Sequence, residues 1–346
     1  MLKITEADIN GIFTDFGIPG RCRSFEELQR YDYEDSDPTG RSVRLIVKAE
    51  TEDGRPYVLR FKNEEDVTPD IVEAQSRFAA ALRERGIETP RVYASDGRFA
   101  RVYGIGGYEV IVTAEEFVPG EVRVVDAETA ERTGMLLARM HNIAEEADLH
   151  VENEVLFDPL TGNDLFDHEM FSKHESVLKE IDAELYDSIE REHARLAKAV
   201  RALEAEPRYA VQGDISDCNL YYTEKGELGV FDFNRSGDNS LFADAAMQAI
   251  FEARLMDYPP EIEADPEPVI LPAFLRGYGR VRPFTKEQRA LFPCLYALVS
   301  AFWLGDLKWC GESLEKAVSS GDAEAVHGHM KRVLGRLASP APDILP

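Results

Sequence analysis

Apolar residues in the first third of the chain fall into short extended runs separated by turns. The runs at residues 42–50 and 56–62 are joined by the turn-forming "TEDG", which is typical of a β-hairpin. The next segment has apolar residues at helical spacing, with Thr68 or Asp70 as a cap and Gly86 as a stop. Two more extended pieces, "RFARVYGI" and "YEVIVTAEEFV", follow this helix. The pattern predicts a small antiparallel sheet with a helix after its first hairpin.

Pro119 and Gly120 end the last of these strands, because proline cannot donate a hydrogen bond to a sheet. Beyond them the apolar spacing is mainly helical, apart from a strand-rich insert at residues 209–234. The sequence therefore predicts an α+β protein with a sheet-rich lobe, residues 1–118, and a larger helical lobe, residues 119–346.

Three polar residues lie at breaks in the apolar pattern of this insert, "YAVQGDISDCNLYYTEKGELGVFDFN". Asp214 and Asn219 bracket a tight loop, and Asp232 ends a hairpin arm that can return it beside Asn219. Any one of them alone is better explained as a turn cap. Together they match the order in a kinase catalytic loop, which has an Asp, an Asn five residues later and a metal-binding Asp in the next hairpin.

At these positions the sequence resembles the aminoglycoside phosphotransferase and choline kinase family. The usual loop of that family reads HGDxxxxN and is followed by an (I/F)D strand. This chain has "QGDISDCN" and "VFDFN", with Gln212 in place of the histidine. "GMLLARMH", ending in His141, and "FADAAMQAI", containing Asp244, are similar to the helices before and after the catalytic region of the family.

The resemblance implies a two-lobed protein-kinase-like fold that binds a nucleotide and magnesium. In it, Asp214 orients and deprotonates an acceptor hydroxyl, and Asn219 and Asp232 hold Mg²⁺. The strand that presents a lysine to the phosphates reads "YVLRF" here, which assigns that position to Arg60. Lys62 points to the same face of an ideal strand and is the second candidate.

The remaining nucleotide contacts also rest on the resemblance. Glu73, on the first predicted helix, matches the ion-pair partner of the phosphate-binding cation, although it could also be an ordinary solvated glutamate. The linker "AEEFVPG" resembles the hinge that binds adenine, which assigns this role to the Glu116 carbonyl and the Val118 amide. The phosphate-covering turn would be "DSDPTGRS", with Gly40 as its single glycine.

Charge and composition narrow the range of partners. The chain has 65 acidic and 39 basic residues, and its formal net charge of -26 repels nucleic acid and anionic membrane surfaces. The first residues, "MLKITEADINGIF", lack the pattern of a secretory signal, and we expect a cytoplasmic protein. Four scattered cysteines and dispersed histidines predict neither disulfides nor a structural metal, and "HGH" at 327–329 reads as a solvated face.

These observations predict a phosphotransferase that moves the γ-phosphate of ATP or GTP to a hydroxyl of a small molecule. The acidic surplus could attract a cationic acceptor such as an aminoglycoside or an amino alcohol, although acidity spread along the whole chain more often serves solubility. Asp217, Asp238 and Glu252 are the candidates to hold it, because they lie near the catalytic elements in the sequence.

Two alternatives remain at this stage. A catalytically degraded kinase-like protein that binds a nucleotide or a partner would explain Arg60, Gln212 and the single loop glycine. A protein kinase is less consistent with the sequence, because no APE-like segment or activation loop follows "VFDFN".

Overall fold

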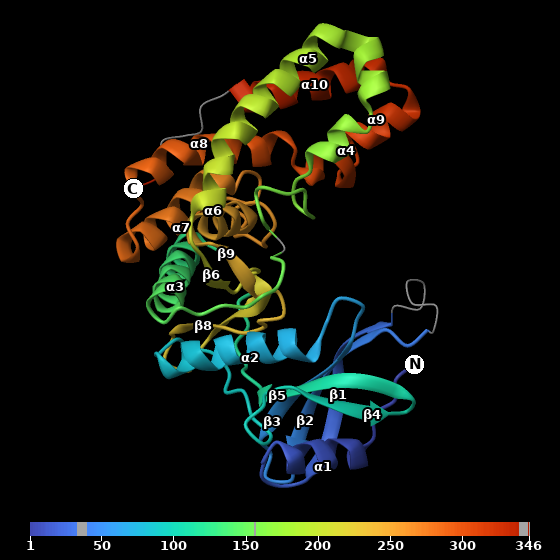
Figure 1. Ribbon diagram of the computed structural model, residues 1–346, viewed down its shortest axis with the longest axis vertical. Helices are drawn as coiled ribbons and strands as arrows, with labels where there is room; N and C mark the ends of the chain where they lie inside the picture. The colour runs from blue at the N-terminus through green and yellow to red at the C-terminus, as the bar shows by residue number, and fades with distance from the viewer. Residues whose placement is uncertain (33–39, 156, 339–344, 346) are drawn as a thin grey trace. The chain divides into compact units, whose positions relative to one another are not determined.

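The computed structural model describes residues 1–32, 40–155, 157–338 and 345 (Figure 1). The chain forms two compact units. The first comprises residues 1–122, 143–153 and 218–237, and the second comprises residues 123–142, 154–217 and 238–346. These units differ from the lobes expected on either side of residue 118, because residues 143–153 and 218–237 group with the first unit.

The first unit is built on a five-stranded antiparallel sheet of order β1-β2-β3-β5-β4. Its strands are β1 (Cys22–Asp32), β2 (Val43–Thr51), β3 (Pro56–Asn63), β4 (Arg101–Ile105) and β5 (Tyr108–Glu116). The predicted hairpin is confirmed as β2 and β3, in which Leu45 pairs with Phe61 and Ile46 pairs with Arg60.

The two faces of the sheet have different chemistry. Helix α1 (Glu6–Asp15) covers one face, where Phe13 packs in a cluster with Leu59 and Phe61 of β3 (Figure 1). Because side chains alternate along a strand, Arg60 and Lys62 point to the opposite face, and both are buried. The hydrophobic alternation of β3 thus places two cations side by side beneath the sheet.

Helix α2 (Pro69–Glu84) packs on the face opposite α1, where its Val72 joins a cluster with Ile111 of β5. Thr68 caps this helix as predicted, since its hydroxyl accepts a hydrogen bond from the N–H of Ile71 at 3.2 Å. The helix ends where expected, with Gly86 at φ +83°, a conformation that glycine adopts without strain.

A small hairpin completes the first unit. Strands β7 (Leu220–Tyr222) and β8 (Leu228–Val230) pair antiparallel, as the sequence predicted for this insert. Strand β6 (Arg208–Val211) pairs instead with β9 (Gly237–Ser240).

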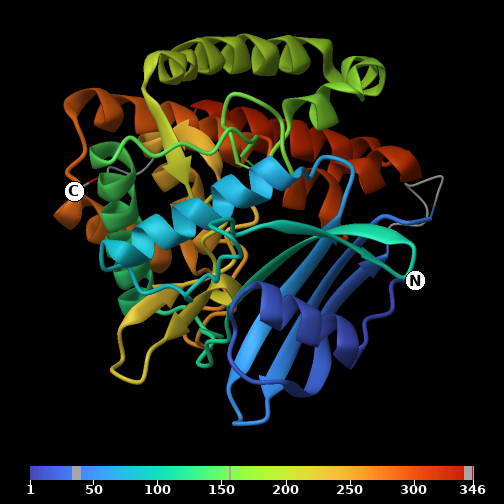
Figure 2. The same ribbon diagram turned by 60° about the horizontal axis from the view of Figure 1, so that its bottom comes forward.

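The second unit is mainly helical (Figure 2). Its long helices α5, α8 and α10 pack against one another, and α6 packs against α7. The helices are α3 (Ala127–Glu146), which runs into the first unit, α4 (His168–Ser172), α5 (Glu175–Val200), α6 (Leu241–Glu252), α7 (Glu267–Val281), α8 (Lys286–Ala301), α9 (Leu314–Ser320) and α10 (Ala323–Ala338). In the described part of the chain, no helix is both long and apolar enough to span a membrane. An antiparallel sheet in one unit and helices in the other confirm the predicted fold class.

Candidate active site

Arg60 of β3 is the centre of a buried charge cluster in the first unit. Its Nη1 lies 3.0 Å from Oδ2 of Asp232, and its Nε donates to Oε1 of Glu115 at 2.9 Å. Glu115 belongs to β5, the strand next to β3. The structure therefore brings the predicted phosphate-binding cation into contact with the predicted magnesium ligand.

The charges of this cluster keep Arg60 and Asp232 ionised. Burial alone would raise the pKa of the Asp232 carboxyl, but the charges of Arg60 and Lys62 outweigh it and hold that pKa below its usual value. Burial likewise disfavours the charged guanidinium of Arg60, and the carboxylates of Asp232 and Glu115 raise its pKa instead. Asp232 also has φ +58°, a strained backbone for a residue with a side chain, of the kind that clusters at functional sites.

Lys62 lies beside this pair, and its Nζ donates to Oδ1 of Asn234. Burial lowers the pKa of Lys62 from 10.5 to about 8, although the nearby Asp232 carboxylate acts in the opposite direction. The first and second candidates for the phosphate-binding cation are therefore both in place, and Arg60 is the one that contacts Asp232.

Asn219 is brought next to the Asp232 segment by the predicted hairpin. Leu220 pairs with Val230, and the N–H of Phe231 donates to the carbonyl of Asn219 at 2.9 Å. Asn219 therefore lies opposite the residue that precedes Asp232, and its side chain is buried. Amide and carboxylate oxygens of this kind are the ligands that magnesium prefers.

Glu73 has other partners than the one expected. Its Oε2 accepts hydrogen bonds from the N–H groups of Phe99 and Ala100, at 2.7 and 2.9 Å. Its Oε1 lies 2.6 Å from Nη2 of Arg77. The expected Arg60–Glu73 pair is therefore wrong, because Glu73 holds the loop before β4.

Gln75 of α2 contacts the segment that follows Asp232, and no local pattern in the sequence indicates this contact. Its Nε2 donates to the carbonyls of Asn234 and Ser236, at 2.8 and 3.3 Å. One turn further along α2, the ring of Phe78 meets the edge of Phe233. These contacts fix the residues that follow Asp232.

The predicted adenine hinge follows β5. The N–H of Glu116 donates to the carbonyl of Arg91 at 2.9 Å. Within the described residues, the N–H of Val118 has no hydrogen-bond partner, as a donor to adenine requires. The predicted phosphate turn, 35–42, lies largely outside the described residues, although its Gly40 has φ +63°.

Asp214 lies in the second unit, in a loop held by two glutamines. Gly213, at φ +83°, allows the sharp turn before it. Oε1 of the fully buried Gln212 accepts a hydrogen bond from the N–H of Asp214 at 2.8 Å, and Oε1 of Gln248 accepts from the N–H of Ile215 at 3.1 Å. Gln212, which replaces the histidine usual in the family, thus organises the loop from the same position.

A buried hydrogen-bond chain continues from this loop into the helices of the second unit. Nε2 of Gln248 donates to Oδ1 of Asp244 at 3.4 Å, and Oδ2 of Asp244 lies 3.0 Å from Nε2 of His141. Nδ1 of His141 lies 2.9 Å from the hydroxyl of Tyr278. All four side chains are buried, so this network holds the Asp214 loop rigidly against α3, α6 and α7.

The structure describes the side chains of two of the three residues expected to hold an acceptor, and these two differ in their burial. The side chain of Asp217 lies outside the described part of the structure. Asp238 is half-buried in β9, and its carbonyl accepts from Nε of Arg208 at 3.3 Å. Glu252 is fully buried, which argues against its expected contact with an acceptor.

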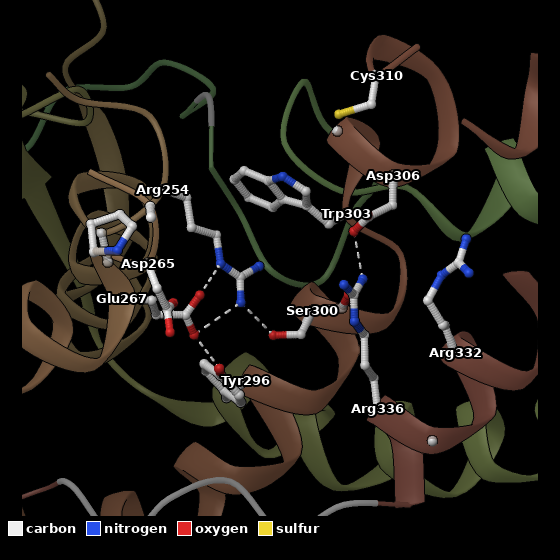
Figure 3. Close-up of a pocket in the computed structure, with 15 residues that line it drawn as sticks. Arg254, Asp265, Glu267, Tyr296, Ser300, Trp303, Asp306, Cys310, Arg332 and Arg336 are labelled. Atoms are coloured by element: carbon white, nitrogen blue, oxygen red, sulfur yellow. Dashed lines mark hydrogen bonds and ion pairs between the residues drawn. The ribbon is translucent and has the colours of Figure 1, made fainter. Parts of the chain in front are cut away.

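The second unit also contains a cavity of about 720 Å³, lined by residues of α7, α8 and α10 and of the segments that follow α6 and α8 (Figure 3). Arg254 crosses it and binds both carboxylate oxygens of Glu267 and the hydroxyl of Ser300. Arg336 pairs with Asp306 at 2.6 Å on the other side. No residue of the Asp214 loop lines the cavity, so we do not assign it to the acceptor.

A comparison of the sequence with models of known protein families points to the same chemistry as these residues. Residues 38–290 match the phosphotransferase enzyme family, which is more than half of the chain. The chain belongs to this family. The expected resemblance and the expected small-molecule phosphotransferase are therefore confirmed. Among curated proteins, none matches this sequence.

Solved structures of small-molecule kinases share the fold of this phosphotransferase. A microcompartment-associated aminopropanol kinase has a TM-score of 0.57 at 18% identity, over 88% of this chain and 91% of the other. An amicoumacin kinase, in complex with AMP-PNP, Ca²⁺ and its ligand, has a TM-score of 0.55 at 15% identity, over 92% and 91% of the two chains. An aminoglycoside phosphotransferase from Alicyclobacillus acidocaldarius has a TM-score of 0.54 at 15% identity, over 90% and 91%.

Proposed function

We propose that this protein transfers the γ-phosphate of ATP to a hydroxyl of a small, positively charged molecule in a magnesium-dependent reaction. The observation that carries the proposal is the pairing of the buried Arg60 with the partly buried Asp232 in the first unit. Burial opposes the charge of the Asp232 carboxyl, and the neighbouring cations keep its pKa low, so the carboxylate is ionised as a magnesium ligand must be.

The residues fit the metal that the family implies. The oxygens of Asn219 and Asp232 are hard donors, and magnesium is bound through such carboxylate and amide oxygens together with nucleotide phosphates. Held by Asn219 and Asp232, the ion would supply positive charge that offsets the negative charge developing on the transferred group. Arg60 holds Asp232 in position and is the cation proposed to meet the phosphate oxygens.

Asp214 is the proposed base. A carboxylate at the acceptor hydroxyl orients it and takes its proton as the phosphoryl group moves. The hydrogen bonds from the backbone of Asp214 and Ile215 to Gln212 and Gln248 support this role, because they fix the loop that carries the carboxylate. For adenine, the proposed contacts are the carbonyl of Glu116 and the N–H of Val118.

The proposed acceptor class rests on charge. The net charge of -26 creates a field that concentrates cations and repels anions. The three structural neighbours above are named as kinases of aminopropanol, amicoumacin and aminoglycosides, two of which are amines by name. An amino alcohol or an aminoglycoside is therefore the proposed substrate class.

The test is a turnover screen with Mg²⁺ and either ATP or GTP. The acceptor panel pairs aminoglycosides and amino alcohols with uncharged sugars, and Asp214→Asn serves as the inactive control. We expect phosphorylation of at least one amine acceptor by the parent and not by the variant. Nucleotide binding without turnover on any acceptor would support the degraded alternative, and turnover of uncharged acceptors alone would overturn the proposed substrate class.

A further inference from the structure

Two histidines and a glutamate meet in the second unit, away from every residue assigned to phosphoryl transfer. His168 is the first residue of α4, and Glu190 and His193 are three residues apart on α5. Nε2 of His168 lies 2.9 Å from Oε1 of Glu190. The rings of His168 and His193 are stacked, with centroids 3.7 Å apart and planes inclined by 13°. One possible ligand atom from each residue lies within 4.8 Å of the other two.

The surrounding structure holds these side chains in place. The N–H of Asp167, just before α4, donates to the carbonyl of Phe302 at 3.1 Å. The ring of Phe302 meets both histidines edge-on, with centroids 4.9 Å from His168 and 5.2 Å from His193. Because Glu190 and His193 are three residues apart on one helix, they share a face. The group is therefore formed by rigid elements rather than by a loose surface cluster.

We propose that His168, Glu190 and His193 bind a transition-metal dication of the zinc type. Two imidazoles and one carboxylate are a donor set that zinc uses when a fourth position is left for water. Zn–N and Zn–O distances of about 2.0–2.2 Å place tetrahedral ligand atoms roughly 3.3 Å apart. The ligand atoms of the three residues lie within 4.8 Å of one another, so each pair has at most about 1.5 Å to close. Magnesium, which prefers six oxygens, does not suit the site.

The histidines themselves favour a metal over simple packing. Within the described residues, neither ring nitrogen of His193 has a hydrogen-bond partner, although the residue is half-buried. A metal would supply that partner, and it would replace the contact between His168 and Glu190 with two coordination bonds. A divalent cation also balances a donor set that carries one negative charge.

Other histidines of this unit do not form a comparable group. His327 pairs with Asp182 alone, at 3.1 Å, and His329 is buried and bonds the carbonyl of Glu312 at 2.8 Å. The two histidines of the "HGH" segment therefore have different environments. His327 is partly exposed, in agreement with the expected solvated face, whereas His329 is buried. The proposed site also revises the expectation that the chain has no structural metal.

Bound metal would join α4 to the part of α5 that follows its kink at Asp182. Because the unfolded chain does not preform the site, metal binding stabilises the folded second unit. The expected effect is therefore on stability and not on phosphoryl transfer.

The experiment uses the full-length protein, stripped with a chelator and kept in excess Mg²⁺ to occupy oxygen-rich sites. Calorimetric titration with Zn²⁺ and visible absorption on titration with Co²⁺ measure binding, and thermal unfolding measures stability. We expect one equivalent of Zn²⁺ to bind, d–d bands typical of low-coordinate Co²⁺ to appear, and Tm to rise by at least about 3 °C.

His193→Ala and Glu190→Gln should each abolish the bound equivalent and the rise in Tm. Glu190→Gln is nearly isosteric, so it keeps the test valid if the histidine variant unfolds. His327→Ala is the matched control, since it removes a histidine paired with a single carboxylate that α5 also carries. Absence of binding by the parent, binding unchanged in both ligand variants, or equal loss in His327→Ala would overturn the proposal.

Discussion

Nη1 of Arg60 and Oδ2 of Asp232 lie 3.0 Å apart, although 172 positions separate the two residues in the chain. The contact joins the middle of the sheet to the segment after β8. Since Glu115 contacts the same guanidinium and Lys62 lies next to it, charges of alternating sign are buried together. Removing one member weakens the charge compensation of the others, and substitutions can test this directly.

Arg60→Ala should destabilise the protein strongly. Breaking a buried ion pair typically costs roughly 3–5 kcal/mol, and the uncompensated Asp232 should also bind magnesium–nucleotide more weakly. Arg77→Ala is the control, because its pair with Glu73 is largely exposed on the arginine side and should contribute about 0–1 kcal/mol. Urea unfolding followed by circular dichroism measures the first effect, and calorimetry measures the second. Equal stability of the two variants would contradict the role of Arg60.

The buried Lys62 predicts a dependence of stability on pH. Its pKa is about 8 in the folded state and 10.5 ordinarily, a difference that corresponds to about 3 kcal/mol. Between these values the unfolded chain binds more protons than the folded chain, so the free energy of unfolding rises with pH. The full destabilisation is present below the folded pKa and is relieved as the pH approaches the unfolded one.

Lys62→Met isolates this contribution, because methionine keeps the volume and cannot titrate. The parent should gain stability relative to the variant as the pH is raised from about 7.5 to 10. Urea unfolding at a series of pH values measures the difference. Parallel pH profiles for the two proteins would show that Lys62 keeps its ordinary pKa.

Asp214→Asn and Asp232→Ala should differ in their effects on turnover and on magnesium–nucleotide affinity. A positioned base contributes on the order of a hundred- to ten-thousand-fold in rate, so Asp214→Asn should lower turnover by that factor and leave magnesium–nucleotide affinity nearly intact. Asp232→Ala should damage both, because a metal ligand also holds the phosphates. Turnover assays beside calorimetry distinguish the two, with circular dichroism to confirm folding. Full activity of folded Asp214→Asn would show that this residue is only a turn cap.

Variants of Gln75 and Glu73 test which residue of α2 supports nucleotide binding. Gln75 makes the observed contact with the segment after Asp232, and Glu73 was expected to pair with Arg60. Gln75→Ala removes both hydrogen bonds to the segment after Asp232 and should weaken magnesium–nucleotide binding. Glu73→Gln keeps an acceptor for the loop before β4 and should leave nucleotide binding unchanged. Calorimetric titration of both variants checks this. The opposite ranking would return the role to Glu73.

The sequence alone determined the local elements and the order of the chemistry. Alternating and helical apolar patterns, turn residues and caps act within a few positions, so the β2–β3 hairpin, the Thr68 cap and the β7–β8 hairpin were all predictable. The order of Asp214, Asn219 and Asp232 likewise pointed to a phosphotransferase, because three functional residues at family spacing seldom coincide by chance.

Only the tertiary structure decided which side chains meet. Residues two apart on a helix differ by about 200° in direction, so the rotation of α2 on the sheet gives Gln75, and not Glu73, to the Asp232 segment. The register of β3 and β5 likewise selects Glu115 for Arg60. The group of His168, Glu190 and His193 depends on how α4 docks beside α5. Such contacts arise from packing between elements far apart in the chain, and no local pattern encodes them.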